Sequence, residues 1–120
     1  MKILIVDDSR VMRQIVVRTL RQAGLDGHDI VEAENGKLGF DAVLAHQPDL
    51  VLSDWNMPEM TGIEMLHALR ANGHQVPLGF VTSEGSPEMV AKAHAGGAMF
   101  VITKPFTPEG FRDALEPVLV

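Results

Sequence analysis

Short, mostly apolar runs alternate along this chain with longer segments in which apolar residues recur at helical spacing. In the first of the longer segments, Val11 and Ile15, and then Val16 and Leu20, lie four residues apart, which is typical of a helix. The short runs predict five strands, at Ile3–Val6, Asp29–Ala33, Leu50–Ser53, Leu78–Val81 and Met99–Ile102. The chain therefore reads as five repeats of a strand followed by a helix.

Residues that start and stop helices support this alternation. A side chain able to accept a hydrogen bond from a free backbone N–H precedes each helical segment, at Ser9, Asn35, Thr61, Ser86 and Thr107. Glu64 follows Thr61 by three residues, which is the spacing of a capping box. Stop signals follow the first three helical segments, at Gly24, Pro48 and the pair Asn72-Gly73.

Strands this apolar, each followed by a helix, predict an α/β fold with a parallel sheet that is covered on both faces. Ligands of such sheets bind beyond the carboxyl ends of the strands, near the point where the strand order reverses. The residues directly after each strand are therefore the candidates for function.

The composition agrees with one globular domain over residues 1–120. The chain is 46% hydrophobic and 22% charged and has no apolar run long enough to span a membrane. It has no cysteine, which excludes disulfides and thiolate metal sites and fits a cytoplasmic protein. The net charge of −6, without a basic cluster in the sequence, argues against direct binding to nucleic acid.

Four of the five predicted strand ends carry groups that complement one another. Asp7 and Asp8 follow the first strand, Asp54 the third, Thr82 the fourth and Lys104 the fifth. Each residue alone is an ordinary cap, turn residue or solvated lysine. Together, three carboxylates on one edge repel one another, and a divalent cation and a lysine relieve that repulsion. A carboxylate can also accept a phosphoryl group, which hydroxyl and ammonium groups then stabilise.

Four segments resemble the signature segments of bacterial response-regulator receiver domains. They read ILIVDDSRVMR, LVLSDWNMPEMTGIEML, FVTSE and VITKPFTPEGF, and they occur in the family's order. The likeness covers essentially the whole chain and is closest to the single-domain chemotaxis type. It implies a doubly wound, flavodoxin-like (βα)5 fold with strand order 2-1-3-4-5.

The resemblance also implies a role for each residue of the cluster. Asp54 would be the phosphoacceptor, Lys104 would contact carboxylate and phosphoryl oxygens, and Thr82 would bond the phosphoryl group and move toward it. The implied ligands of Mg²⁺ (or Mn²⁺) are the side chains of Asp7, Asp8 and Asp54, Asp7 mostly through water, and the backbone carbonyl of Asn56. Asn56 and Glu84 occupy the positions that tune dephosphorylation, and they imply a comparatively short-lived phosphoryl group.

The implied partners are a histidine kinase or a histidine phosphotransfer protein, and a protein target on the face formed by the fourth helix, fifth strand and fifth helix. We expect a monomer that catalyses only its own phosphorylation and slow dephosphorylation. Two alternatives stay open: the N-terminal receiver of a longer regulator, and a Mg²⁺-dependent hydrolase of phosphate esters. The hydrolase would need a general acid two residues after the nucleophile, where this chain has Asn56.

Val101 is the clearest departure from the family pattern. The family usually has a tyrosine or phenylalanine three residues before the lysine, and that ring swings inward when the threonine moves. A stiff β-branched valine cannot do this. Phe100 is one position earlier, so strand alternation predicts that it faces the other side of the sheet. Either Thr82 and its loop carry the change without a ring, or the readout surface differs.

Overall fold

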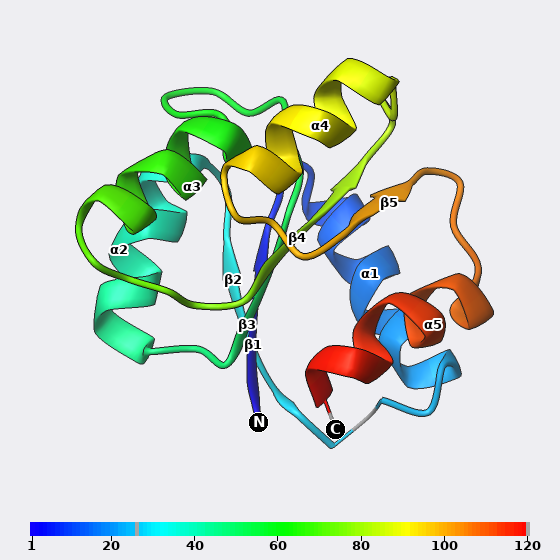
Figure 1. Ribbon diagram of the computed structural model, residues 1–120. Coiled ribbons are helices and arrows are strands. Elements are labelled where there is room, and N and C mark those ends of the chain that lie inside the picture. The colour runs from blue at the N-terminus through cyan, green and yellow to red at the C-terminus, as the bar shows by residue number, and fades with distance from the viewer. Residues whose placement is uncertain (26, 120) are drawn as a thin grey trace.

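The structure, a computed structural model, describes residues 1–25 and 27–119. It confirms the predicted alternation of strands and helices (Figure 1). The strands are β1 (Lys2–Val6), β2 (Asp29–Ala33), β3 (Leu50–Ser53), β4 (Leu78–Thr82) and β5 (Val101–Thr103). The helices are α1 (Arg10–Gln22), α2 (Gly36–His46), α3 (Gly62–Ala71), α4 (Pro87–Ala95) and α5 (Pro108–Leu119). None of the helices in these ranges is long and apolar enough to cross a membrane.

The five strands form one parallel sheet in the order β2-β1-β3-β4-β5, as predicted. Helices α2, α3 and α4 cover one face of this sheet, and α1 and α5 cover the other (Figure 1). The order reverses direction at β1, because the chain goes from β1 outward to β2 and then returns to β3 on the other side. The carboxyl ends of β1 and β3 therefore meet at the switch point of the sheet.

Alternate residues of each strand supply the two halves of the core. In β1, Ile3 and Ile5 face α1 and α5, whereas Leu4 and Val6 face α2 and α3. All four side chains are almost completely buried. Burial of apolar side chains on both faces stabilises a parallel sheet by about 25 cal/mol for each Å² removed from water.

The predicted caps form the starts of the helices. The side-chain oxygens of Ser9, Asn35, Thr61, Ser86 and Thr107 accept hydrogen bonds from backbone N–H groups in the first turns. Thr61 and Glu64 make the complete capping box. Gly24 ends α1 with a left-handed φ of 82°, and α2 ends just before Pro48. Local chemistry thus explains these boundaries well.

Four predicted strand boundaries were wrong by one or two residues. β1 begins at Lys2 instead of Ile3, and Thr82 is the last residue of β4 instead of the residue after it. β5 runs from Val101 to Thr103 instead of from Met99 to Ile102. The chain nevertheless pairs with β4 before Val101, since the Met99 N–H donates to the Leu78 carbonyl at 2.8 Å. As an edge strand, β5 has only one neighbour, so its ladder is defined by β4 alone.

Val101 and Phe100 lie on opposite faces of the sheet, as strand alternation predicted. Val101 packs with the core beneath α2, α3 and α4, and Phe100 packs with the core beneath α1 and α5. The ring of Phe100 lies directly on Gly79 of β4, in space that a Cβ would fill. The Phe100 side chain therefore packs on the face of the sheet opposite to α4.

Candidate functional site

The carboxyl ends of β1 and β3 place two carboxylates next to each other. Val6 is paired with Ser53 in the sheet, so the residues that follow them, Asp7 and Asp54, leave the sheet side by side. The Asp54 N–H donates to the Val6 carbonyl at 2.8 Å, which holds the two chain segments together beyond the last ladder pair. The register of two central strands thus sets the geometry of the site.

Asp8 completes a cluster of three carboxylates. One oxygen from each of Asp7, Asp8 and Asp54 lies within 4.8 Å of the others. Asp7 is buried, Asp54 is partly buried and Asp8 is exposed, so the cluster opens to solvent on one side. Hard oxygen ligands at this spacing, with an open side for water and phosphate oxygens, fit Mg²⁺.

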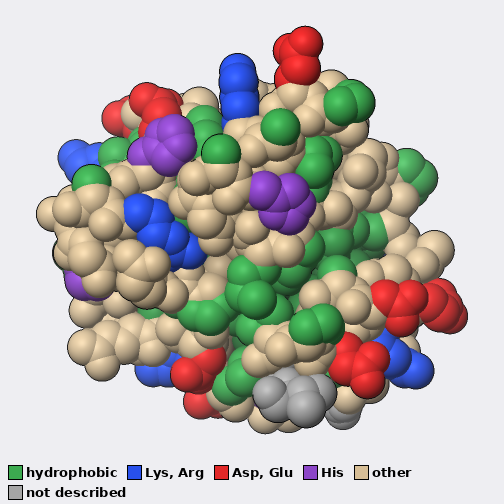
Figure 2. Space-filling model, viewed as in Figure 1, with side chains coloured by type: hydrophobic (Ala, Val, Ile, Leu, Met, Phe, Trp, Pro, Cys, Tyr) green, Lys and Arg blue, Asp and Glu red, His purple; other side chains and the backbone are tan. Residues whose placement is uncertain are grey.

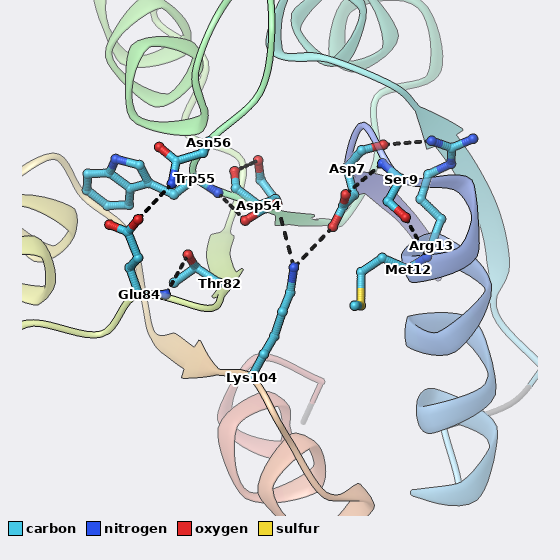
Figure 3. A network of polar contacts seen from close by, with 11 residues as sticks. Asp7, Ser9, Met12, Arg13, Asp54, Trp55, Asn56, Thr82, Glu84 and Lys104 are labelled. Atoms are coloured by element: carbon cyan, nitrogen blue, oxygen red, sulfur yellow. Dashed lines mark hydrogen bonds and ion pairs between the residues drawn. The ribbon is translucent and has the colours of Figure 1, made fainter.

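Lys104 brings the positive charge that the sequence predicted. Its Nζ lies 3.4 Å from Oδ2 of Asp7 and 3.6 Å from Oδ2 of Asp54, and its side chain is 17% exposed. Figure 3 shows the lysine reaching between the two aspartates from the loop after β5. The backbone N–H of Lys104 also donates to the carbonyl of Thr82 at 2.8 Å, which ties this loop to β4.

The pKa of Asp7 is raised above its ordinary value, chiefly because burial disfavours the charged carboxylate. The neighbouring charge of Asp54 raises it further. Opposing both, the Ser9 N–H donates to Oδ1 of Asp7 at 2.9 Å, and Lys104 attracts the ionised form. Asp7 thus bears an unfavourable charge that a bound cation would stabilise.

Two residues that sequence reasoning missed support the cluster. Arg13 donates from Nη1 to the carbonyl of Asp7 at 2.6 Å (Figure 3), and its Nε pairs with Glu32 at 2.9 Å. Gly62 begins α3 against the phosphoacceptor candidate, because a Cβ on Gly62 would overlap the carbonyl oxygen of Asp54. The position of Arg13, one helical turn after Ser9, is the only sequence signal that could have indicated its role.

Asn56, Glu84 and Thr82 lie on the other side of Asp54 (Figure 3). Asn56 Nδ2 donates to Oε1 of Glu84 at 3.2 Å, and the N–H of Glu84 donates to Oγ1 of Thr82 at 3.2 Å. Thr82 is buried, whereas Asn56 and Glu84 are exposed. The structure therefore brings the two predicted tuning positions and the predicted switch residue into one hydrogen-bonded chain.

Trp55 is an optical probe within the site itself. Its backbone N–H donates to Oδ1 of Asp54 at 2.7 Å, and its half-buried ring packs on Phe80 with 4.9 Å between the ring centroids. We therefore expect the fluorescence of Trp55 to respond to a change of charge at Asp54, to which its backbone is hydrogen-bonded.

Comparison with known proteins gives this arrangement its context. The sequence profile described as "Response regulator receiver domain" matches residues 3–116. The chain belongs to the response regulator receiver family. The predicted acids, hydroxyl and lysine thus lie at the strand ends of a receiver domain of two-component signalling.

Similar proteins include chemotaxis regulators. The chemotaxis protein CheY homolog of Campylobacter jejuni is 42% identical over 122 residues, covering 99% of this chain and 92% of that protein. Chemotaxis protein CheY1 of Helicobacter pylori is 39% identical and covers 99% of this chain and 97% of that protein. The crystal structure of CheY4 from Vibrio cholerae matches with a TM-score of 0.85 at 36% identity, over 98% of this receiver and 97% of that chain.

Proposed function

We propose that this receiver takes a phosphoryl group onto Asp54 from the phosphohistidine of a histidine kinase or phosphotransfer protein, in a Mg²⁺-dependent reaction. The observation that carries the proposal is the placement of the Lys104 ammonium 3.6 Å from Asp54, beside three carboxylates whose oxygens lie within 4.8 Å of one another. A nucleophile, a cation and a metal-ligand set thus converge on one partly open edge.

In the transfer, a carboxylate oxygen of Asp54 attacks phosphorus while the P–N bond to the donor imidazole breaks. The phosphohistidine ring, protonated on its other nitrogen, keeps the electron pair of the broken bond and leaves as neutral imidazole, and Asp54 becomes an acyl phosphate. Lys104 pairs with the negative charge of the phosphoryl oxygens. Mg²⁺ held by Asp7, Asp8, Asp54 and the Asn56 carbonyl would neutralise further charge on those oxygens. The protein catalyses only this transfer and its own slow loss of phosphate.

The output is a change of protein binding in a cytoplasmic, monomeric regulator of the chemotaxis type. Thr82, buried at the end of β4, would bond the phosphoryl group with its hydroxyl, which now accepts from the Glu84 N–H. Because Thr82 accepts an N–H from Lys104 with its carbonyl, its movement acts on the loops before α4 and after β5. The partner surface proposed is therefore the face of α4, β5 and α5.

The test combines phosphorylation by acetyl phosphate with fluorescence of Trp55. We expect Mg²⁺-dependent incorporation of one phosphoryl group, seen by intact-mass spectrometry and absent from Asp54→Ala. We expect Mg²⁺ and then beryllofluoride to change the fluorescence of Trp55 in the wild type. Asp49→Ala, an exposed acid at the opposite end of β3, is the matched control. Phosphorylation that persists in Asp54→Ala, or proceeds equally in EDTA, would contradict the proposal.

A further inference from the structure

A groove of about 690 Å³ runs between α3 and α4, and none of its lining residues belongs to the carboxylate cluster. Its lining residues are Ile63, His67, Arg70, Lys92, Ala95 and Gly96. Figure 2 shows Lys, Arg and His side chains gathered over this part of the surface. Two cations thus meet in one groove of a chain whose net charge is −6. The volume is in the range of protein ligand sites.

Arg70 is held in place at the edge of this groove. Its Nη1 donates to the His74 carbonyl at 2.9 Å and its Nη2 donates to the Gly97 carbonyl at 3.3 Å. A guanidinium has five N–H donors, so these two bonds fix its plane and leave further donors for a ligand. Because the Arg70 side chain is already ordered, a carboxylate that binds it does not have to pay the entropy cost of ordering an arginine.

The wall formed by α4 is made of small residues that let side chains of α3 approach closely. A Cβ on Gly96 would lie 3.0 Å from Leu66 and 3.3 Å from the ring of His67. Gly97 has a left-handed φ of 102°, and a Cβ there would lie 3.0 Å from Nε of Arg70. Ile63 and Ala95 add apolar surface. The groove therefore combines small and apolar lining residues with the positive charges of Arg70 and Lys92.

Carboxylates of the described residues do not neutralise these cations. The ion pairs in residues 1–25 and 27–119 involve Arg13 and Lys104, but neither Arg70 nor Lys92. Glu64 of α3, next to the lining residue Ile63, is engaged in the capping box with Thr61. Glu88 precedes Lys92 by one turn without an ion pair between them. At physiological salt, charges more than about 8 Å away are largely screened. A ligand in the groove therefore responds mainly to Arg70 and Lys92 and less to the net charge of the molecule.

We propose that the groove between α3 and α4 docks an acidic segment of a protein partner. Carboxylates of that segment would bind Arg70 and Lys92, and an apolar side chain between them would cover Ile63 and Ala95. Charge complementarity identifies the partner's chemistry: an ordered guanidinium and an unpaired ammonium above an apolar floor favour alternating acidic and apolar side chains. This surface adds to the α4–β5–α5 face and does not depend on phosphorylation of Asp54.

The probe is an acetylated, amidated peptide of alternating glutamate and leucine, and the control peptide has glutamine in place of glutamate. We expect the glutamate peptide to shift the amide resonances of Ile63, Gly96 and Gly97 in ¹⁵N-labelled protein, and to bind more weakly as salt is added. Lys92→Glu should weaken its binding about tenfold or more. Lys37→Glu, the same change at an exposed position on α2, should leave the binding unchanged.

Lys92 is exposed and lies outside the carboxylate cluster, so Lys92→Glu should keep the fold and its phosphorylation by acetyl phosphate. Circular dichroism and the phosphorylation assay check this separately from the proposed function. Three outcomes would overturn the docking proposal: equal binding of both peptides, equal loss in Lys37→Glu, or shifts confined to residues outside the groove. Salt-sensitive self-association in sedimentation, lost in Lys92→Glu, would instead assign the groove to a second copy of this chain.

Discussion

The amide of Asn56 donates a hydrogen bond of 3.2 Å to the carboxylate of Glu84, and so joins the loop after β3 to the loop after β4. Glu84 in turn donates its N–H to Thr82. The two positions that the resemblance assigns to dephosphorylation therefore form one hydrogen-bonded unit with the predicted switch residue. Both side chains are exposed, and Figure 3 shows them next to Asp54.

Replacing Glu84 tests this unit. In Glu84→Ala, Asn56 loses its partner, and an incoming water loses an acceptor that would orient it. We expect phosphoryl loss from Asp54 to slow by a factor of about three to ten, which corresponds to one hydrogen bond. This rate is measured by intact-mass spectrometry, which follows the decay of the phosphorylated form after acetyl phosphate is removed. Glu88→Ala on α4 is the control, and equal decay in Glu84→Ala and the wild type would disprove the role.

Asp7→Asn should stabilise the metal-free protein and weaken its binding of Mg²⁺. Burial, and then the charge of Asp54, raise the pKa of Asp7, so the ionised form is unfavourable in the fold without a cation. Removing that charge should raise the free energy of unfolding in EDTA, because the neutral amide carries no charge that burial disfavours. Urea unfolding with EDTA or Mg²⁺ measures both effects. Asp8→Asn, at an exposed position, should change the free energy of unfolding in EDTA less than Asp7→Asn does. An Asp7→Asn protein that is less stable than the wild type in EDTA would contradict the explanation.

Gly79→Ala should destabilise the protein through Phe100. A Cβ at this position would overlap the Phe100 ring, and overpacking of this kind costs about 1–3 kcal/mol. Phe100→Leu in the same chain should recover part of the loss, because the smaller side chain leaves the space free. Thermal unfolding of the two single variants and the double variant gives the coupling between them. Strictly additive effects would show that the ring is not the obstacle.

Val101→Tyr tests whether the missing aromatic ring matters for switching. Val101 is half-buried beneath α4 and paired with Phe80, while Thr82 is linked by hydrogen bonds to both Lys104 and Glu84. We therefore expect that loop movement carries the change, and that tyrosine alters the extent of phosphorylation by less than about twofold. The same α4 amides should respond to beryllofluoride in both proteins. A response that extends to new residues of α4 or β5 only in Val101→Tyr would support the altered-readout interpretation.

The capping box of α3 should make part of the stability dependent on pH. The backbone N–H of Thr61, and then its hydroxyl, lower the pKa of Glu64 below its ordinary value of 4.5. A lowered pKa contributes stability above the ordinary value, and this is lost as pH falls through 4.5 and below. Glu64→Gln should therefore lose less stability than the wild type between about pH 6 and pH 3 in urea unfolding. Glu88→Gln is the control, and parallel curves for Glu64→Gln and the wild type would refute the assignment.

The sequence alone predicted the order of the elements, the parallel sheet and the edge where Asp7, Asp54 and Lys104 meet. The element order follows from local causes, since caps act within one turn and strand alternation acts between neighbours. The shared edge follows from the parallel sheet, because the carboxyl ends of parallel strands lie on the same side. Even the separation of Phe100 from Val101 follows from that alternation.

Only the tertiary structure decided which side chains bond across elements. Arg13 on the Asp7 carbonyl, the Asn56–Glu84 bond and the two cations that line the groove between α3 and α4 had no clear signal in the sequence. Each depends on the packing of two elements that are distant in the chain, and on the side-chain conformations which that packing allows. Residue order restricts neighbours in a strand or a turn, but contacts between elements form only when the whole core has closed around the sheet.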